Sequence, residues 1–305
     1  MIVPEAVQGT PESPRERFHV LTVGAGVVGH AEGTALRERG HVVVVSDVDE
    51  AVLSQRRREG FRTISMDALS LAGVDVVLIS VPTPTSEGET DLHHVEEAVA
   101  SIGDALGRGS SAEPGRYRVI ILRSTVPPGT TDEVVIPLLE AEAGLQAGLD
   151  FGVCVCPEYL RQRHAVSDSV APRLVLIGQL DERSGDVAER LNAGFGCPIY
   201  RVPIREAEFQ KYAHNLTNAS KIAFFNELRR VADAIGVDAE SAFRLVACSA
   251  EAKWNAEYGT LDLGPYGGPC LPKDLEAFLT WAGRSGLDLP ILSAVEQSNH
   301  PTPAR

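Results

Sequence analysis

Apolar and polar positions alternate in blocks along the first two thirds of the chain. Short apolar runs, rich in valine, leucine and isoleucine, are typical of strands buried on both faces of a parallel sheet. We expect such strands over 19–23, 41–46, 74–81, 117–122, 152–156, 173–177 and 199–202, with helices over 27–39 and about 92–106. Strands that alternate with helices predict an α/β fold built on a doubly wound parallel sheet.

The pattern changes after Pro203. A single helix is expected from Arg205 to about Ile235, because this stretch has no proline and no glycine before Gly236. Shorter helical patterns follow over 239–246, 275–282 and 291–298. We therefore expect a flexible tail over 1–17, a sheet domain over 18–204 and a smaller all-helical domain with one long helix over 205–305.

A G-x-G-x-x-G motif, Gly24 to Gly29, stands directly after the first strand and opens a helix. In a Rossmann domain the first glycine allows a tight turn, and the second lets the pyrophosphate of a dinucleotide approach the backbone. The third lets the helix pack closely on the strand. The motif therefore assigns Gly24, Gly26, Val27, Val28 and Gly29 to cofactor binding.

Asp47 ends the second strand about 20 residues further on, where a carboxylate binds ribose hydroxyls. The same carboxylate would repel a 2′-phosphate, so NAD is predicted rather than NADP. The less favoured alternative is a plain glycine turn followed by a surface aspartate.

Three further strands end in polar, proline-stiffened segments. These segments carry Pro82 and Thr83, Ser124 and Thr125, and Glu158, Tyr159 and Leu160. Because ligands of open α/β sheets bind beyond the carboxyl ends of the strands, all three segments are candidate site loops. Ordinary turn chemistry is the alternative for any one of them.

Two segments of the helical domain carry further candidates. Glu208, Lys211 and Asn215 share one face of the long helix, although a solvated polar stripe would give the same pattern. Cys270 follows two glycines and precedes Lys273 and Asp274. Such surroundings favour a reactive thiolate, whereas a lone cysteine is more often inert and buried.

Together these segments resemble the UDP-glucose/GDP-mannose dehydrogenase family, in family order and over nearly the whole chain from about residue 19. The matching segments are GAGVVG (24–29), VPTP (81–84) with Asp91-Leu92, STVPPGT (124–130), PEYL (157–160), E-x-x-K-Y-x-x-N (208–215), Asn226-Glu227 and GGPCLPKD (267–274). STVPPG combined with G-G-x-C-x-x-K-D is the most specific part of the resemblance.

The resemblance implies that NAD-dependent oxidation turns the primary alcohol of a nucleotide sugar into a carboxylate in two hydride transfers. Cys270 would form a thiohemiacetal and then a thioester, which water hydrolyses. The implied catalytic residues are Cys270, Lys211, Asn215, Asp274, Glu158 and Thr125. Pro82, Thr83, Ser124, Thr125 and Lys273 would contact NAD, and Glu158, Tyr159, Leu160, Lys211, Asn215, Tyr266 and Gly267 would contact the substrate.

The chain departs from the family pattern at four points. Gln162 stands where a second carboxylate is usual, Lys253-Trp254-Asn255 replaces an R-I-G segment, and Arg123 replaces a lysine. Family members also continue for a further domain beyond the position of Arg305. The expectation is either a naturally shorter lineage with a smaller substrate or a truncated form with weak turnover of UDP-sugars.

Composition narrows the partners. The 28 Lys and Arg against 42 Asp and Glu give a formal net charge of −14, which opposes binding to nucleic acids and to anionic membranes. No charge-free apolar run reaches the ~20 residues that span a bilayer. The five cysteines are scattered and odd in number, which favours a reducing, cytoplasmic location. Cys154 and Cys156 should share one buried face of a strand.

Two other functions remain open: a two-electron alcohol dehydrogenase of the β-hydroxyacid type, and a catalytically reduced NAD-binding assembly protein. We also expect a homodimer, because apolar residues occupy more than one side of the long helix. These residues are Phe209, Leu216, Ile222, Phe224, Phe225, Leu228 and Val231.

Overall fold

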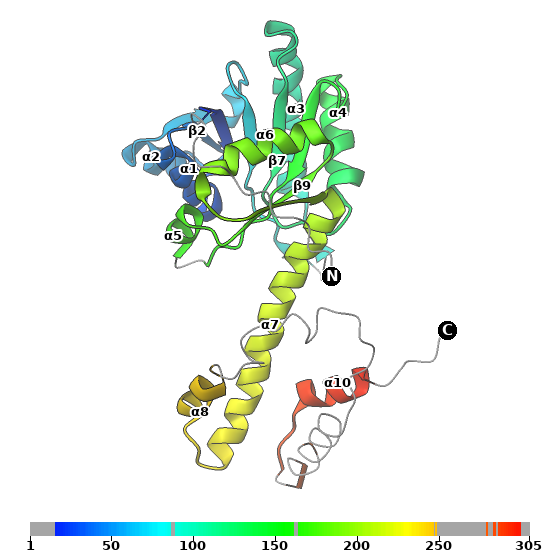
Figure 1. The fold of residues 1–305 in the computed structure, drawn as a ribbon. Helices are drawn as coiled ribbons and strands as arrows, with labels where there is room; N and C mark the ends of the chain where they lie inside the picture. The colour runs from blue at the N-terminus through cyan, green and yellow to red at the C-terminus, as the bar shows by residue number, and fades with distance from the viewer. Residues whose placement is uncertain are drawn as a thin grey trace, which may run out of the picture. The chain divides into compact units, whose positions relative to one another are not determined.

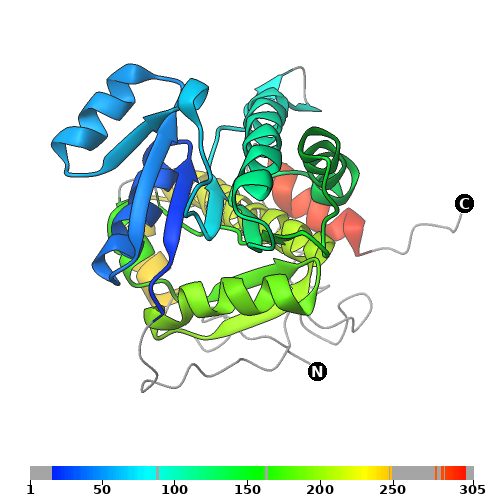
Figure 2. The same ribbon diagram turned by 90° about the horizontal axis from the view of Figure 1, so that it is seen from above.

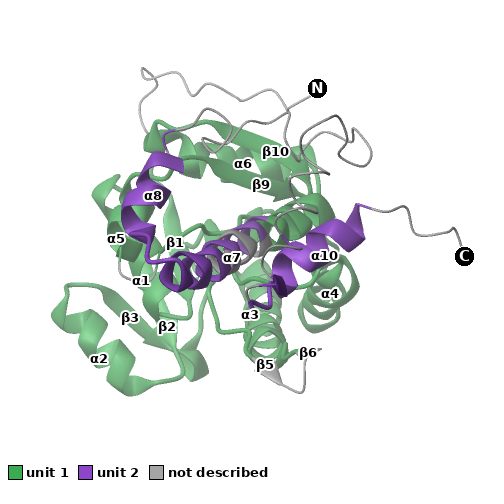
Figure 3. Ribbon diagram, turned by 90° about the horizontal axis from the view of Figure 1, so that it is seen from below, with its two compact units in different colours: residues 1–213 green, residues 214–305 purple. Residues whose placement is uncertain are grey.

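The computed structural model describes residues 16–86, 89–161, 164–246 and 286–299, together with Cys248, Leu279, Gly283 and Arg284. The chain divides into two compact units, residues 1–213 and 214–305 (Figure 3). The division falls inside the long helix α7 (Ile204–Ala234), later along the chain than residue 204, where the sequence pattern changes.

The first unit is built on an eight-stranded sheet in the order β10-β9-β8-β7-β4-β1-β2-β3 (Figure 1). The strands are β1 (His19–Val23), β2 (Val42–Asp47), β3 (Arg62–Ser65), β4 (Val76–Ile79), β7 (Arg118–Leu122), β8 (Phe151–Val155), β9 (Val175–Gln179) and β10 (Ile199–Pro203). A separate antiparallel pair joins β5 (Thr85–Ser86) to β6 (Glu89–Thr90). Six neighbouring strands of this sheet, β8, β7, β4, β1, β2 and β3, are parallel, which confirms the predicted doubly wound sheet.

The last two strands correct one detail of the prediction, since β9 runs antiparallel to β8 and β10 runs parallel to β9. Cys154 pairs with Gln179, so β9 starts beyond the carboxyl end of β8 and runs back along it. A parallel return needs a long crossover, usually a helix that packs on the sheet. The short helix α5 (Ala165–Val170) in this connection packs against α1 (Val27–Glu38) instead.

Helices cover both faces of the sheet (Figure 2). On one face α3 (His93–Ala112) and α4 (Ile136–Ala143) pack on Leu21, Val23 and their neighbours. On the other face α1 and α6 (Glu182–Asn192) pack on Val20 and Val45. Residues that alternate along each strand thus feed two separate cores, as expected for a sheet buried on both sides.

Several elements escaped the sequence pattern: the helices α2 (Glu50–Arg58), α4 and α5, the edge strand β3 and the short pair β5–β6. The α2 sequence is strongly polar, so it shows no clear apolar stripe. Among the described residues, no helix is both long and apolar enough to cross a membrane.

In the second unit the predicted helices are present as the rest of α7, α8 (Ala239–Val246) and α10 (Pro290–Ser298). Val231, Leu289 and Leu292 form its buried apolar cluster, with Phe224 and Leu228 packed against it. The helix predicted over 275–282 lies almost entirely outside the described residues, as does most of the tail over 1–17.

Candidate active site

The glycine loop between β1 and α1 has the shape that a dinucleotide requires. Gly24 adopts φ +90°, and a Cβ there would lie 2.5 Å from the Ser80 carbonyl oxygen. A Cβ at Gly29 would lie 1.8 Å from the Gly24 oxygen, whereas a Cβ at Gly26 would meet nothing within 4 Å. The outer glycines are therefore needed for packing, and the middle one leaves open space at the start of α1.

The helix start itself offers hydrogen-bond donors to an anion. Helix α1 begins at Val27, and its N-cap Gly26 makes no side-chain capping bond. The first N–H groups of an α-helix have no partner inside the helix and lie at the positive end of its dipole. The amides of Val27 and Val28 are therefore suited to a pyrophosphate.

Asp47 stands beside this loop at the end of β2. Its Oδ2 accepts the N–H of Ala25 at 2.7 Å, and its Oδ1 accepts the N–H of Asp49 at 2.9 Å. The half-buried carboxylate is thus held next to the glycine loop, as the spacing along the chain predicts.

Sequence reasoning missed Arg56, which supports the loop from α2. This side chain is buried, and its Nε donates to the Ala25 carbonyl oxygen at 3.0 Å. Its Nη1 lies 2.5 Å from Glu59 Oε2, which in turn lies 3.0 Å from His30 Nε2. Burial and the nearby Arg56 guanidinium lower the pKa of His30. Asp49 accepts the N–H of Ala51 and so caps the start of α2. An aspartate at this position is the sequence signal from which the helix could have been predicted.

The loops after β4 and β7 are joined to each other. Thr83 Oγ1 donates to the Thr125 carbonyl oxygen at 2.8 Å, and Ser124 Oγ donates to the Val81 carbonyl oxygen at 2.7 Å. Because β4 and β7 are neighbours, their carboxyl ends meet at one edge of the sheet. Three of the predicted cofactor residues are thereby brought together.

The loop after β8 meets the first turns of α7. Lys211 is only 5% exposed, and its Nζ donates to the backbone oxygen of Glu158 and lies 3.1 Å from Glu158 Oε1. The Tyr159 ring centroid lies 5.4 Å from the same Nζ. The Tyr159 hydroxyl donates to Gln210 Oε1, and burial raises the pKa of Tyr159. Glu158 Oε2 accepts the N–H of Leu160 at 2.5 Å, which fixes the turn.

Glu208, one turn before Lys211, is also buried, with 2% exposure. Its two carboxylate oxygens accept the N–H groups of Gly129 at 2.5 Å and Thr131 at 2.9 Å. The alternative of a solvated polar stripe is therefore wrong for Glu208 and Lys211. Asn215, one turn beyond Lys211 on α7, belongs to the second unit and is exposed.

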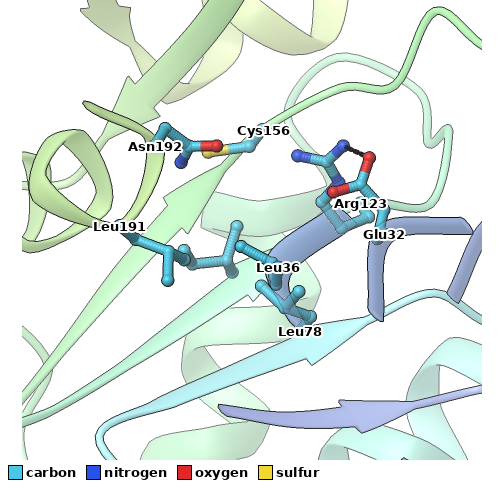
Figure 4. A pocket seen from close by; sticks show the side chains of 8 residues that line it. Glu32, Leu36, Leu78, Arg123, Cys156, Leu191 and Asn192 are labelled. Atoms are coloured by element: carbon cyan, nitrogen blue, oxygen red, sulfur yellow. Dashed lines mark hydrogen bonds and ion pairs between the residues drawn. The ribbon is translucent and has the colours of Figure 1, made fainter. Parts of the chain in front are cut away.

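A small pocket lies on the face of the sheet that α1 and α6 cover, next to Arg123 at the start of the loop after β7 (Figure 4). Arg123 forms a buried ion pair with Glu32 of α1, whose Oε1 also accepts from Ser169 Oγ at 3.2 Å. Arg123, which replaces the lysine of the family pattern, thus connects the start of the loop after β7 to α1 directly and to α5 through Glu32. The pocket is lined by Glu32, Leu36, Leu78, Ile121, Arg123, Cys156, Leu191 and Asn192.

Cys154 and Cys156 share one buried face of the sheet, as predicted. Burial raises the pKa of Cys156 to about 12 and that of Cys154 further still. Neither thiol is therefore a candidate nucleophile. The remaining predicted residues, Cys270, Lys273, Asp274, Tyr266 and Gly267, lie outside the described residues, as do Gln162 and Lys253-Trp254-Asn255.

Comparison with known proteins shows the family to which the chain belongs. Residues 50–195 match the NAD binding domain of the UDP-glucose/GDP-mannose dehydrogenase family, and residues 205–301 match its central domain. GDP-mannose 6-dehydrogenase of Pseudomonas putida is 35% identical over 92% of this chain and 68% of its own length. A UDP-glucose 6-dehydrogenase of Bacillus subtilis is 29% identical over 93% of this chain and 66% of its own.

Solved structures give the same result. The ternary complex of GDP-mannose dehydrogenase from Pseudomonas aeruginosa superposes with a TM-score of 0.82 and 32% identity, over 92% of this chain and 68% of that one. A UDP-glucose dehydrogenase from Pyrobaculum islandicum has a TM-score of 0.68 and 30% identity, over 95% and 70%. The chain thus spans about two thirds of the length of these relatives. It belongs to the UDP-glucose/GDP-mannose dehydrogenase family, and it is an NAD-dependent oxidoreductase that acts on CH–OH groups.

Proposed function

We propose that the chain oxidises the primary alcohol of a sugar, a nucleotide sugar or a nucleoside-like substrate to the carboxylate, through a covalent intermediate on Cys270. The observation that carries the proposal is the contact of buried Lys211 with Glu158. Glu158 follows β8, at the carboxyl edge of the sheet where the glycine loop and the Thr125 loop also begin. A buried ammonium next to a carboxylate at a ligand-binding edge suits charge stabilisation and proton transfer.

The residues present fit NAD, since Gly26 leaves open space at the start of α1 and Asp47 stands beside it. When bound, NAD accepts the hydride that leaves the substrate carbon. The Val27 and Val28 amides would hold the pyrophosphate, and Asp47 the ribose hydroxyls. Pro82, Thr83, Ser124, Thr125 and Lys273 would contact NAD, as the family resemblance implies.

For the covalent chemistry we assign roles to five groups. Loss of the first hydride leaves an aldehyde. The Cys270 thiolate adds to its carbonyl carbon, and Lys211 and Asn215 stabilise the resulting oxyanion. Loss of a second hydride from the thiohemiacetal carbon, which a second NAD would accept, gives a thioester. Water, deprotonated by Glu158 or Asp274, then attacks the thioester carbon, the C–S bond breaks and the thiolate is restored.

The remaining assignments concern binding. Thr125 would hold a water in the site. The segment Glu158-Tyr159-Leu160, together with Tyr266 and Gly267, would contact the substrate. Because the Tyr159 hydroxyl already donates to Gln210, we assign its contact with substrate to the backbone and the ring rather than to the hydroxyl.

The relatives suggest where to begin with substrates. Six GDP-mannose 6-dehydrogenases are 32–35% identical to this chain, and two UDP-glucose 6-dehydrogenases are 29% identical. GDP-mannose is therefore the first compound to test, followed by UDP-glucose and smaller sugar derivatives.

Counting NADH formed per substrate consumed tests the reaction. Two NADH are expected, whereas a single NADH would indicate the simple alcohol dehydrogenase, and none with any of these compounds would indicate an NAD-binding assembly protein. Cys270→Ser should abolish acid formation while NAD still binds. The matched control is Cys248→Ser, since Cys248 is a free and exposed cysteine of the same unit. Acid release at the wild-type rate by Cys270→Ser would show that Cys270 is not the nucleophile.

A further inference from the structure

The first turns of α7 contact two of the site loops at once, through side chains that are both buried. Glu208 accepts the N–H groups of Gly129 and Thr131 in the loop after β7, and Lys211 contacts Glu158 in the loop after β8. The two residues are three apart, so they project from one face of the helix. All of these contacts lie within the first compact unit.

The chemistry of the Glu208 contact makes it a strong anchor. A carboxylate at 2% exposure is costly unless hydrogen bonds compensate its charge. Here the compensation comes from backbone N–H groups at the start of the helical segment that runs from Thr131 through α4. Helix N-termini favour negative charge, and hydrogen bonds to ionised acceptors are about twice as strong as neutral ones.

The loop that Glu208 holds also carries Thr125. Gly129 adopts φ +100°, so the backbone turns sharply before the helix begins. At the other end of the loop, Ser124 and Thr125 are bonded to the loop after β4. The loop is therefore fixed at both ends. Among the described residues, buried Glu208 and exposed Arg205, which pairs with Asp132 and Glu133, connect its second end to the helix that carries Lys211.

We propose that Glu208 is a positioning residue: its carboxylate sets the spacing between the Thr125 loop and the Lys211–Glu158 pair. This inference rests on the roles given above to Thr125, Lys211 and Glu158. Glu208 itself touches no reacting atom and acts through the backbone of Gly129 and Thr131.

Hydrogen–deuterium exchange of Glu208→Gln tests the coupling without any substrate. Glutamine keeps the side-chain shape but directs an NH2 group at one of the two N–H donors. Amide exchange should become roughly tenfold faster in segment 123–133 and also in segment 157–161. The control is Asp181→Ala, which removes the cap on the Ser184 N–H at the start of α6 and should leave both segments unchanged. Faster exchange confined to 129–133 would reduce Glu208 to a helix cap and overturn the proposal.

Kinetics with GDP-mannose or UDP-glucose supply the second readout. Glu208→Gln should lower kcat by about tenfold to a hundredfold and change KM for NAD much less, because misplacement of reacting groups lowers the rate more than it lowers binding. Asp181→Ala should keep the wild-type kcat. An equal fall of kcat in the two variants would overturn the proposal.

Lys211→Ala separates this inference from the function it rests on. Wild-type kcat in that variant would contradict the proposed role of Lys211, whereas the exchange experiment on Glu208→Gln would still decide the coupling between the loops.

Discussion

Ala25 shows at the residue scale how the cofactor loop is held. Its N–H is bound by Asp47 from the end of β2, and its carbonyl oxygen is bound by Arg56 from α2. Asp47 therefore supports the loop, and under the proposed function it would also bind the ribose hydroxyls. Its substitution should change both the choice of cofactor and the order of the loop.

We expect the wild-type protein to prefer NAD to NADP, and Asp47→Asn to narrow that preference. The neutral amide no longer repels a 2′-phosphate, and it accepts the Ala25 N–H less strongly. The measurement is kcat/KM for both cofactors, with Asp49→Asn as the control, since asparagine caps α2 as well as aspartate does. Equal kcat/KM values for NAD and NADP in the wild-type protein would sink the assignment.

Gln162 should make hydrolysis of the thioester slow, because an amide cannot act as a base. A covalent adduct on Cys270 should then accumulate during turnover and be visible by mass spectrometry. Gln162→Glu should shorten its lifetime, whereas Gln146→Glu at an exposed position should not. If no adduct forms and the replacement has no effect, hydrolysis does not depend on this position.

His41 should make the protein less stable in mild acid. Burial is the main cause that lowers its pKa below the usual 6.5, and Arg39 adds to it, although a backbone hydrogen bond with Leu191 acts in the opposite direction. A lowered pKa in the folded state means that the stabilisation is present above pH ~6.5 and is lost as the pH falls through the folded pKa. Protonation would also disrupt the bond that Nδ1 accepts from the Phe18 N–H.

Melting temperatures between pH 8 and 5 test this. His41→Asn keeps an acceptor for Phe18 but removes the titrating group, so its melting temperature should fall less on acidification. An identical fall in both proteins would contradict the role of His41.

At the element scale, the turn between β1 and α1 separates the structural task of a glycine from its binding task. Gly29 lies inside α1 and Gly26 is its N-cap, and a side chain would meet different surroundings at the two positions. A methyl group at Gly29 has no room beside the Gly24 oxygen, whereas a methyl group at Gly26 points into open space. The φ of Gly26 is −67°, a value that any residue adopts.

We expect Gly26→Ala to fold with nearly wild-type stability and to bind NAD at least tenfold more weakly, since the methyl group occupies the approach of the pyrophosphate. Gly29→Ala should lose on the order of 3 kcal/mol of stability through overpacking. Thermal melts and titrations with NAD check both. Wild-type affinity for NAD in Gly26→Ala would show that the dinucleotide does not pass over this residue.

At the scale of the whole molecule, several of the apolar α7 residues on which the prediction of a homodimer was based pack within the chain itself. Phe224, Leu228 and Val231 pack in the apolar cluster of the second unit. The ring centroids of Phe225 and Phe243 lie 5.0 Å apart. Phe209, in the first unit, is 62% exposed. An exposed aromatic side chain on a helix is a natural contact for a second copy of the chain.

Light scattering at micromolar concentration should therefore give the mass of a dimer, and Phe209→Asp should shift it toward the monomer without changing the circular dichroism spectrum. Leu149→Asp, at a residue of similar exposure before β8, serves as the control. A monomeric wild-type protein would refute the prediction.

The sequence alone determined the parallel part of the sheet apart from β3, the glycine loop, the place of Asp47 and the edge at which the site loops gather. Each of these depends on local information: apolar runs predict strands, Gly24 and Gly29 have no room for a side chain, and parallel strands share one carboxyl edge. The family motifs then linked these places to a chemistry.

The tertiary structure decided what depends on residues far apart in the chain. The reversal of β9 follows from how its connection packs against α1, and α2 forms without an apolar stripe and brings Arg56 to the loop. Glu208 lies 79 residues from Gly129 in sequence, and Lys211 lies 53 from Glu158. A polar face on a helix looks the same in sequence whether water or a loop covers it, because only folding brings the covering backbone N–H groups into place.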